Sequence, residues 1–493
     1  MSDALCWQSA GTLAAAVRRG ERSAVEVLEA HLDRARAVEP RLGAFVRLCE
    51  ERARRAAEEI DRRVAGGEDP GPLAGVPLGV KDNLCVRGVE TTAASRILSG
   101  YLPPYTATAV ARLEAAGAVV LGKLNLDEFA MGSSTETSAY GPTRNPWDPE
   151  RVPGGSSGGS AASVAAGEVP LSLGSDTGGS IRQPAALCGC VGVKPTYGLV
   201  SRYGLIAFAS SLDQVGPLAR TCADAALALD ALVGPDPRDA TSASPPWDPA
   251  ARPFAAAVAA ASLEGRTLGV VPEYLERTAD PEVRTAVEKA LGAAERAGAR
   301  LREVSLRSAD EAIPAYQIVS TAEASSNLAR YDGVRFGRRC AAPKDLEDLY
   351  ARTRGEGFGR EVKRRIVLGT FVLSSGFYEA YYLRGQDARR RVRADLLAAL
   401  DDVDALVGPT SPVPAFRLGE RLDDPLAMYS VDVFSVSANL AGLPALSLPC
   451  GFTAAGLPVG LQLTGRPFAD PDLLALGRGL EEALALPKRR PLP

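Results

Sequence analysis

Two glycine- and serine-rich segments, separated by a short apolar segment, constrain the fold of this chain more than any other feature. The first is GGSSGGS at residues 154–160, and the second is GSDTGGSIR at residues 174–182. A flexible linker has this composition. However, residues 161–173 between them and residues 188–193 after them are apolar and have to be buried. We therefore expect both segments to be ordered loops inside a folded domain.

Several known loop types do not fit these segments. A phosphate-binding loop is excluded because no Gly-Lys-Ser/Thr follows and no GxGxxG is present. Residues 154–158 match G-x-S-x-G, the nucleophile elbow of α/β-hydrolases, but that fold needs a histidine after the serine. The one histidine, His31, lies far before it, in a helix that starts with the capping box Ser23 and Glu26. We interpret His31 as a structural residue and exclude Ser-His-Asp and Cys-His mechanisms.

The basic residues limit which group could activate a serine. Of 56 basic residues 49 are arginines, which stay protonated and cannot act as a base. No lysine follows a serine in an S-x-x-K motif. Lys81 and Lys123 each follow a predicted buried strand, at residues 73–80 and 119–121, where burial favours a neutral amine. The residues alone leave both open among seven lysines: Lys81, Lys123, Lys194, Lys289, Lys344, Lys363 and Lys488.

Composition sets the remaining limits. The 493 residues are 46% hydrophobic with a net charge of -4, which is typical of a globular protein without a nucleic-acid groove. Eight cysteines without a CxxC pair, and the lack of an export signal, predict free thiols in the cytoplasm. Missing histidine ligands exclude a zinc site. No apolar run approaches the ~20 residues that span a bilayer.

Alternating strand and helix patterns favour an α/β sheet covered by helices. Residues 1–65 are predicted to form two or three amphipathic helices, and residues 311–400 are mostly helical. Proline-rich residues 234–253 form a surface connection. Further predicted elements are a helix at 106–116, strands at 404–407, 444–449 and 459–463, and a last helix at 470–484.

The glycine-serine segments also resemble a known family. GGSSGGSAA and GSDTGGSIRQPAA, together with GVPLGVKDN around Lys81, are similar to the motifs of the amidase-signature family, and the resemblance extends over nearly the whole chain. It implies one large domain with a central mixed sheet covered by helices, in which residues 1–65 pack as a helical segment on a catalytic domain at 66–493. It also implies that Ser180 is the nucleophile, Lys81 the base, and Ser156, with a cis peptide bond, the serine that bridges them.

A serine nucleophile attacking an amide needs donors for the oxyanion. Thr177, Gly178, Gly179 and Ser180 can present consecutive backbone N–H groups, and glycine allows close approach there. Asp176 is expected to orient this loop rather than to act as an acid.

Three stretches, residues 200–214, 361–374 and 424–444, resemble the branch of the family that hydrolyses glutamine for tRNA-dependent amidotransferases. By that resemblance Arg365 binds the α-carboxylate, Asp432 binds the α-ammonium, and Tyr316 is a hydroxyl contact. Arginine suits a carboxylate because it forms bidentate hydrogen bonds, although the adjacent Arg364 remains an alternative. The loop after Phe129 is expected to line the pocket with residues that include Met131 and Gly132.

The same resemblance implies partners. Ammonia would pass to a B subunit, which holds most of the tRNA and uses ATP and Mg²⁺ to amidate glutamate or aspartate carried on tRNA. A small C subunit would join the two into a heterotrimer, and this chain would carry no cofactor or metal itself. The alternative is a stand-alone amidase for a small amide. A scaffold without activity is disfavoured because all three catalytic positions are filled.

Overall fold

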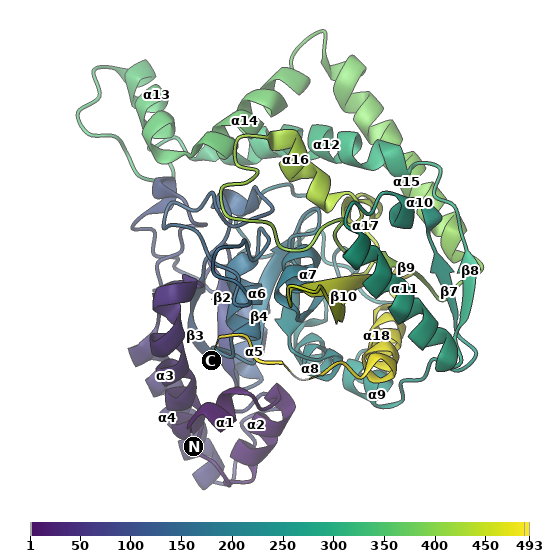
Figure 1. The fold of residues 1–493 in the computed structure, drawn as a ribbon. Helices are drawn as coiled ribbons and strands as arrows, with labels where there is room; N and C mark the ends of the chain where they lie inside the picture. Colours follow the sequence, from purple (N-terminus) through teal and green to yellow (C-terminus); the bar gives the residue numbers. More distant parts are fainter. Residues whose placement is uncertain (1, 488, 493) are drawn as a thin grey trace.

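The centre of the molecule is one mixed sheet, in which the described residues form eleven strands (Figure 1). The computed structural model describes residues 2–487 and 489–492, so Lys488 lies outside the described residues. The strand order is β1-β3-β2-β4-β6-β5-β10-β11-β9-β7-β8. The strands are β1 (Phe45–Leu48), β2 (Pro77–Lys81), β3 (Val119–Leu124), β4 (Leu171–Asp176), β5 (Val191–Lys194), β6 (Gln214–Ala219), β7 (Thr267–Val270), β8 (Arg300–Glu303), β9 (Ala405–Pro409), β10 (Ala445–Phe452) and β11 (Pro458–Thr464). The prediction of one α/β domain with a central mixed sheet is confirmed.

Three parallel strands in this sheet carry the first part of the site. β2 pairs in parallel with β3 on one side and with β4 on the other. The strand predicted at residues 73–80 begins only at Pro77, because the chain turns at Gly75, whose φ of +71° lies in the left-handed region. β2 therefore ends at Lys81 itself, and all of its residues are buried.

The N-terminal segment, described from residue 2 to residue 65, has four helices rather than two or three: α1 (Ser2–Cys6), α2 (Ala10–Arg18), α3 (Ala24–Leu42) and α4 (Glu50–Ala65). It also adds β1 to the edge of the sheet beside β3, an element that four half-buried residues did not reveal in the sequence. His31 is buried in α3, where its Nδ1 lies 2.8 Å from the Val27 carbonyl oxygen and burial lowers its pKa to about 4. The histidine is structural, as predicted.

The other helices surround the sheet (Figure 1). No helix or strand interrupts the predicted connection at 234–253, and residues 311–400 are mostly helical as expected. The α-helices that follow the N-terminal segment are α5 (Thr108–Ala115), α6 (Gly158–Ala165), α7 (Arg182–Cys188), α8 (Cys222–Leu232), α9 (Phe254–Ala259), α10 (Pro272–Glu276), α11 (Pro281–Arg296), α12 (Ala312–Asn327), α13 (Leu346–Gly357), α14 (Arg360–Val372), α15 (Arg384–Leu400), α16 (Pro425–Tyr429), α17 (Val436–Ala441) and α18 (Asp470–Leu484).

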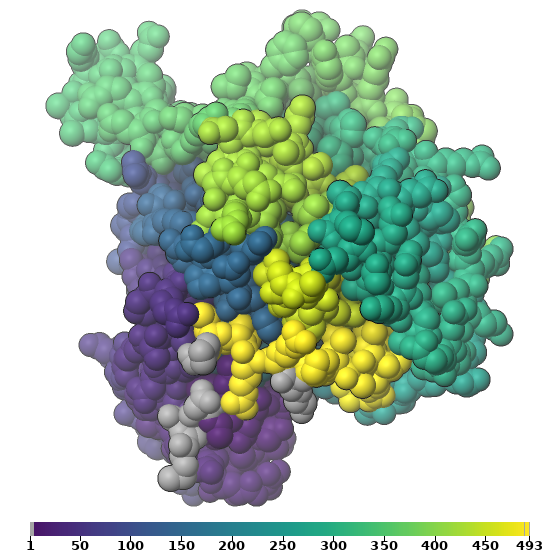
Figure 2. All heavy atoms as spheres, in the orientation of Figure 1, coloured from purple at the N-terminus to yellow at the C-terminus, as the bar shows by residue number. Residues whose placement is uncertain are grey.

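The two ends of the chain lie close together. The Arg34 guanidinium on α3 donates to the Leu492 carbonyl oxygen at 2.7 Å, and Figure 2 shows the yellow C-terminal residues beside the purple N-terminal helices. Among the described residues, no helix combines the length and the apolar character that crossing a bilayer requires.

Candidate active site

The fold brings the two glycine-serine segments into direct contact. The first segment leads into α6, the chain returns through β4, and the second segment follows the end of β4. The Ser157 N–H donates to the Ser180 carbonyl oxygen at 3.1 Å, and the Ser157 hydroxyl donates to the Ser175 carbonyl oxygen, also at 3.1 Å. Both segments are buried, so the linker interpretation is excluded. The Gly155–Ser156 peptide bond is cis, as the resemblance implied.

Lys81 ends β2 with its amine among serine oxygens. Its Nζ lies 2.8 Å from the Ser156 and Ser157 hydroxyl oxygens, 2.9 Å from the Ser175 hydroxyl oxygen and 3.2 Å from the Ser175 carbonyl oxygen. The side chain has no exposed surface. Burial lowers the pKa of Lys81 to about 7, against the opposing charges of three aspartates, Asp127, Asp176 and Asp213. A substantial fraction of this amine is therefore neutral near pH 7, as a base requires.

The serines differ in accessibility. Ser180 keeps 7% of its surface exposed, whereas Ser156 and Ser157 have none. A nucleophile has to reach a substrate, and a bridging group does not. Ser180 is therefore the accessible serine, and Ser156 is a buried serine hydrogen-bonded to Lys81. Their roles as nucleophile and bridging serine stay predictions.

The loop between β4 and α7 has glycines because there is no room for side chains. A Cβ on Gly178 would lie 2.7 Å from the Tyr316 ring, and a Cβ on Gly179 would lie 2.2 Å from the Ser435 hydroxyl oxygen. The Gly179 N–H is already used, since it donates to Asp176 at 2.8 Å. Within the described chain the N–H groups of Thr177, Gly178 and Ser180 meet no acceptor. Of the predicted oxyanion donors, Thr177, Gly178 and Ser180 therefore keep an available N–H group, whereas the N–H of Gly179 is occupied.

Asp176 holds this loop in place. Its carboxylate also accepts the Ile181 N–H at 3.2 Å and pairs with the buried Arg182 guanidinium at 3.0 Å. Burial alone would raise the pKa of Asp176, but the charge of Arg182 and hydrogen bonds, including one from Asn439, lower it to about 2. A carboxyl that stays ionised cannot donate a proton, so this network supports its predicted orienting role.

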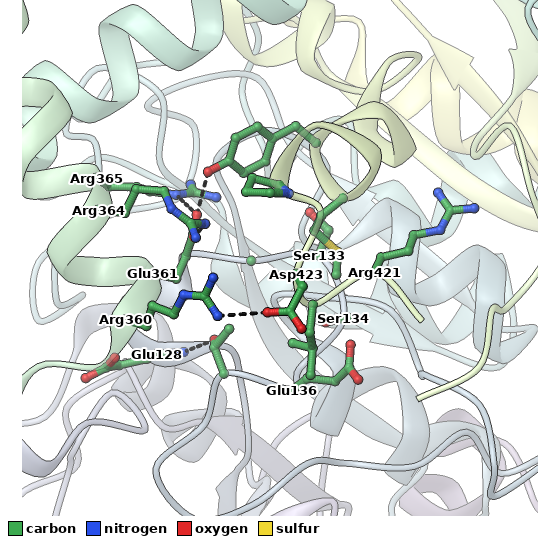
Figure 3. Close-up of a pocket in the computed structure, with 16 residues that line it drawn as sticks. Glu128, Ser133, Ser134, Glu136, Arg360, Glu361, Arg364, Arg365, Arg421 and Asp423 are labelled. Atoms are coloured by element: carbon green, nitrogen blue, oxygen red, sulfur yellow. Dashed lines mark hydrogen bonds and ion pairs between the residues drawn. The ribbon is translucent and has the colours of Figure 1, made fainter. Parts of the chain in front are cut away.

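A cavity of about 300 Å³ lies beside Ser133, whose hydroxyl donates to Asp432 (Figure 3). Lys81, Ser156 and Ser180 are not among the residues that line it. One wall is the loop 132–137, and another is the first part of α14, from which Glu361, Arg364 and Arg365 reach toward the cavity (Figure 3). Arg360 and Asp423 form an ion pair at 2.8 Å on the third side. The remaining lining residues are Glu128, Arg421, Leu422, Pro425, Met428 and Tyr429.

Arg365 and Arg364 differ in burial and in their hydrogen bonds. The Arg365 side chain is 4% exposed and lies over the rings of Phe208 and Tyr429, whereas the Arg364 side chain is 27% exposed. Both pair with Glu361, but Arg365 uses only its Nε, at 2.8 Å. Its two terminal nitrogens meet no acceptor among the described residues. Arg365 is thus the arginine with an oriented, unused pair of donors.

Asp432 has a vacant acceptor. Its Oδ2 accepts the Ser133 hydroxyl at 2.5 Å, whereas Oδ1 is buried without any hydrogen-bond partner in the described chain. A Cβ on Gly179 would lie 3.3 Å from this Oδ1, so Asp432 borders the loop that holds Ser180. Burial raises the pKa of Asp432 to about 7, partly offset by the Ser133 hydrogen bond. A bound cation would both satisfy Oδ1 and keep this carboxylate ionised.

The other predicted pocket residues divide into two groups. Tyr316 is buried against Gly178, beside the loop, and Gly132 lines the cavity. Met131 does not line it: its side chain is fully buried in an apolar cluster with Phe129, because the chain reaches the cavity only one residue later. Its role as a substrate contact stays a prediction.

Three polar residues at the site were missed in the sequence. Asn83 donates to the Ser175 hydroxyl at 2.9 Å, and Ser435 donates to the Gly178 carbonyl oxygen at 2.6 Å. Asn439 donates to Asp176. They lie far from the serine motifs in the chain, and only the fold brings them together with the loop. Asn83 alone had a signal, since it lies two residues after Lys81 on a strand end.

The chain is similar to known proteins that share a family with one another. A model of the family described as Amidase matches residues 26–474. The chain belongs to this family, and the predicted resemblance is confirmed.

The relatives point to one branch of the family. The A subunit of glutamyl-tRNA(Gln) amidotransferase from Symbiobacterium thermophilum is 55% identical over 96% of both chains. The protein of the same name from Carboxydothermus hydrogenoformans is 52% identical over 99% of both. The crystal structure of the protein of that name from Thermotoga maritima is 41% identical with a TM-score of 0.80, covering 97% of this chain and 95% of that one. A peptide amidase from Stenotrophomonas maltophilia is 32% identical with a TM-score of 0.82, covering 99% and 98%.

Proposed function

We propose that this chain is the glutamine-hydrolysing component of a tRNA-dependent amidotransferase, equivalent to the A subunit in its relatives. The main observation behind the proposal is that two charged side chains with unused hydrogen-bonding atoms lie in one buried site. Arg365 offers free guanidinium donors and Asp432 offers a free carboxylate oxygen, close enough for the charge of Arg365 to lower the pKa of Asp432. An α-amino acid carries the two complementary charges. The amidotransferase relatives at 52% and 55% identity support the same substrate.

Acyl transfer begins at Ser180. Its hydroxyl oxygen attacks the side-chain carbonyl carbon of glutamine while its proton moves to Ser156, whose own proton moves to the neutral Lys81 amine. The oxyanion forms beside the N–H groups of Thr177 and Gly178, which need no rearrangement to stabilise it. Collapse breaks the C–N bond, and the proton on Lys81 returns through Ser156 to the leaving nitrogen. The products are ammonia and a glutamyl ester on Ser180.

Hydrolysis of the ester completes the cycle. A water molecule attacks the ester carbonyl, gives its proton to the same Ser156–Lys81 relay, and releases glutamate with the Ser180 hydroxyl restored. Arg365, Asp432 and Tyr316 hold the amino-acid end of the substrate during both steps.

The ammonia serves a larger assembly. We infer that it passes to a B subunit that binds tRNA and uses ATP and Mg²⁺ to convert glutamate or aspartate on tRNA into the amide. A small C subunit completes the heterotrimer. This chemistry lies outside the present chain, and we expect the assembly to work in the cytoplasm.

The test is an assay with and without the partner subunits. Co-expressed with them, the chain should make Gln-tRNA(Gln) from Glu-tRNA(Gln) only when both glutamine and ATP are present. Ser180→Ala should abolish glutamine use, by about 10⁶-fold in kcat, and exogenous ammonia should restore amidation. Robust hydrolysis of simple aliphatic amides by the chain alone, without glutaminase activity, would instead indicate a stand-alone amidase.

A further inference from the structure

Glu128 lies in the wall of the cavity, and no step of the proposed reaction uses it. The residue is 2% exposed and begins the short 3-10 turn Glu128–Ala130, four residues before the cavity loop at Gly132 (Figure 3). A buried carboxylate requires partners.

One partner of Glu128 lies at the start of the helix that carries Arg365, and the other is Ser95, which precedes the 3-10 turn Arg96–Leu98. Glu128 Oε2 accepts the N–H of Gly359, the N-cap of α14, at 2.8 Å, and Oε1 accepts the Ser95 hydroxyl. A Cβ on Gly359 would lie 2.4 Å from Oε2, so the helix start approaches the carboxylate as closely as glycine allows. Burial raises the pKa of Glu128 to about 7, against the hydrogen bonds from Ser95 and Gly359, and the helix dipole favours the ionised form at this end.

The backbone after Glu128 strengthens this connection. Phe129 and Ala130 have φ values of +52° and +61°, in the left-handed region that side chains rarely adopt. Such conformations persist only where the surroundings enforce them. The Phe129 ring packs against Phe358, edge-on with centroids 5.7 Å apart, and against Tyr331 at 5.1 Å. The turn therefore directs Glu128 toward α14 and the following loop toward the cavity.

The same loop reaches the other binding group. Ser133, five residues after Glu128, donates to Asp432 at 2.5 Å. The segment 128–133 thus contacts the N-cap of α14, the helix that carries Arg365, through Glu128, and it contacts Asp432 through Ser133. The spacing between the carboxylate-binding and ammonium-binding groups depends on this loop.

We propose that Glu128 is a positioning residue that sets the place of Arg365 relative to Asp432 and so makes the site selective for amides with an α-carboxylate. This inference rests on the proposed glutaminase function. A carboxylate accepts both donors, Ser95 and Gly359. A methionine there has a similar length and accepts from neither donor. The start of α14 would then move away, and Arg365 with it.

The test compares two substrates in the assembled complex. Glu128→Met should raise the KM for glutamine about tenfold and leave kcat within about twofold, because both hydrogen bonds to Glu128 are lost outside the reacting centre. With 4-aminobutanamide, which lacks the α-carboxylate, kcat/KM should match that of the unsubstituted complex. Ser95→Ala, which removes one of the two hydrogen bonds to Glu128, should give a smaller shift of the same kind, and it carries the test if Glu128→Met does not fold.

The matched control is Glu39→Met. Glu39 is a partly buried glutamate that accepts two backbone N–H groups, from Ala44 and Phe45, but it lies near the end of α3, and it is not among the residues that line the cavity. It should leave both substrates unaffected. An equal loss of kcat/KM on both substrates, or a loss in kcat alone, would overturn the role of Glu128 while glutamine hydrolysis itself still stood. No glutamine hydrolysis by the unsubstituted complex would overturn the proposed function and this inference with it.

Discussion

Lys81 and Lys123 lie on neighbouring parallel strands, both fully buried, yet their surroundings are opposite. Lys123 forms an ion pair with Asp82 at 2.8 Å and donates to the Thr91 hydroxyl at 2.8 Å. Lys81 has hydroxyl and carbonyl partners, with Ser156 at 2.8 Å. A carboxylate stabilises the charged amine, whereas hydroxyls in a buried site leave it close to neutral. One lysine therefore contributes to stability, and the other is suited to catalysis.

The sheet explains this difference. Val80 pairs with Lys123 and Lys81 pairs with Leu124 across β2 and β3. Because side chains alternate along a strand, Lys123 shares a face with Val80 and Asp82, and Lys81 points to the other face. The face with Asp82 builds an ion pair, and the face with the serines builds the reaction centre.

The largest expected effect is on turnover. Lys81→Met should lower kcat for glutamine about 10⁴- to 10⁶-fold, as removal of a catalytic base does in related serine mechanisms. Single-turnover measurement of the glutamyl ester would report it. Lys123→Met should keep kcat per folded molecule within about threefold, and a comparable loss in both variants would reject the distinction.

The second effect is on stability, where the substitution of Lys123 is expected to matter more than that of Lys81. Lys123→Met leaves Asp82 buried without its partner and should lower the free energy of unfolding by about 3–5 kcal/mol. Urea denaturation would measure this. Asp82→Asn in the same chain should recover part of the loss, because it removes the uncompensated charge. No recovery would show that packing, not the ion pair, was lost.

The third effect is the pH dependence of turnover. Burial lowers the pKa of Lys81 to about 7. A base has to be neutral, so kcat at saturating glutamine should be constant well above pH 7 and fall about tenfold per unit well below it. Saturating substrate keeps Asp432 ionised through its ammonium group. Lys123→Met should show the same profile, and a kcat that does not change with pH across the neutral range would contradict Lys81 as the base.

The smallest effect makes the surroundings of Lys81 resemble those of Lys123. Asn83 donates to the Ser175 hydroxyl, which in turn contacts Lys81. Asn83→Asp would place a carboxylate one hydroxyl away from the amine and should raise the pKa of Lys81, shifting the acid limb of kcat upward by about one pH unit. The pH–rate profile measures it. A downward shift would be incompatible with electrostatic control of this amine.

Much of the site was predictable from the residues and the family resemblance, and its failures have local causes. The segments that hold Ser156, Ser180 and Lys81 meet, since Lys81 contacts the Ser156 hydroxyl and the Ser157 N–H donates to the Ser180 carbonyl oxygen. The catalytic roles of the three residues stay predictions. Met131 is buried one residue before the cavity begins, and nothing in a loop sequence marks where the backbone turns toward a cavity. β1 was missed because four half-buried residues show no clear alternation.

The donors around the loop show a second limit. Gly179 was predicted to bind the oxyanion, but its N–H is taken by Asp176. Both residues belong to one motif, so their spacing in the sequence is the same whether that N–H points inward or toward the substrate. Only the backbone dihedral angles distinguish the two, and these depend on Ser435 and other distant segments.

The amino-acid sequence by itself determined the kind of chemistry. The one histidine lies in a helix far before the serines, so a serine mechanism in this chain needs one of the seven lysines as its base. The apolar segments between and after the glycine-serine motifs have to be buried, so those motifs have to be ordered. The residues alone left Lys81 and Lys123 open, and the tertiary structure distinguishes their surroundings: Lys81 lies among hydroxyls, and Lys123 pairs with Asp82. It likewise buries Arg365 more deeply than Arg364. A lone sequence records burial as a pattern along one strand, but the charge state of a buried amine depends on the groups that the sheet register and chain crossings bring to it, such as Ser156, 75 residues further along the chain.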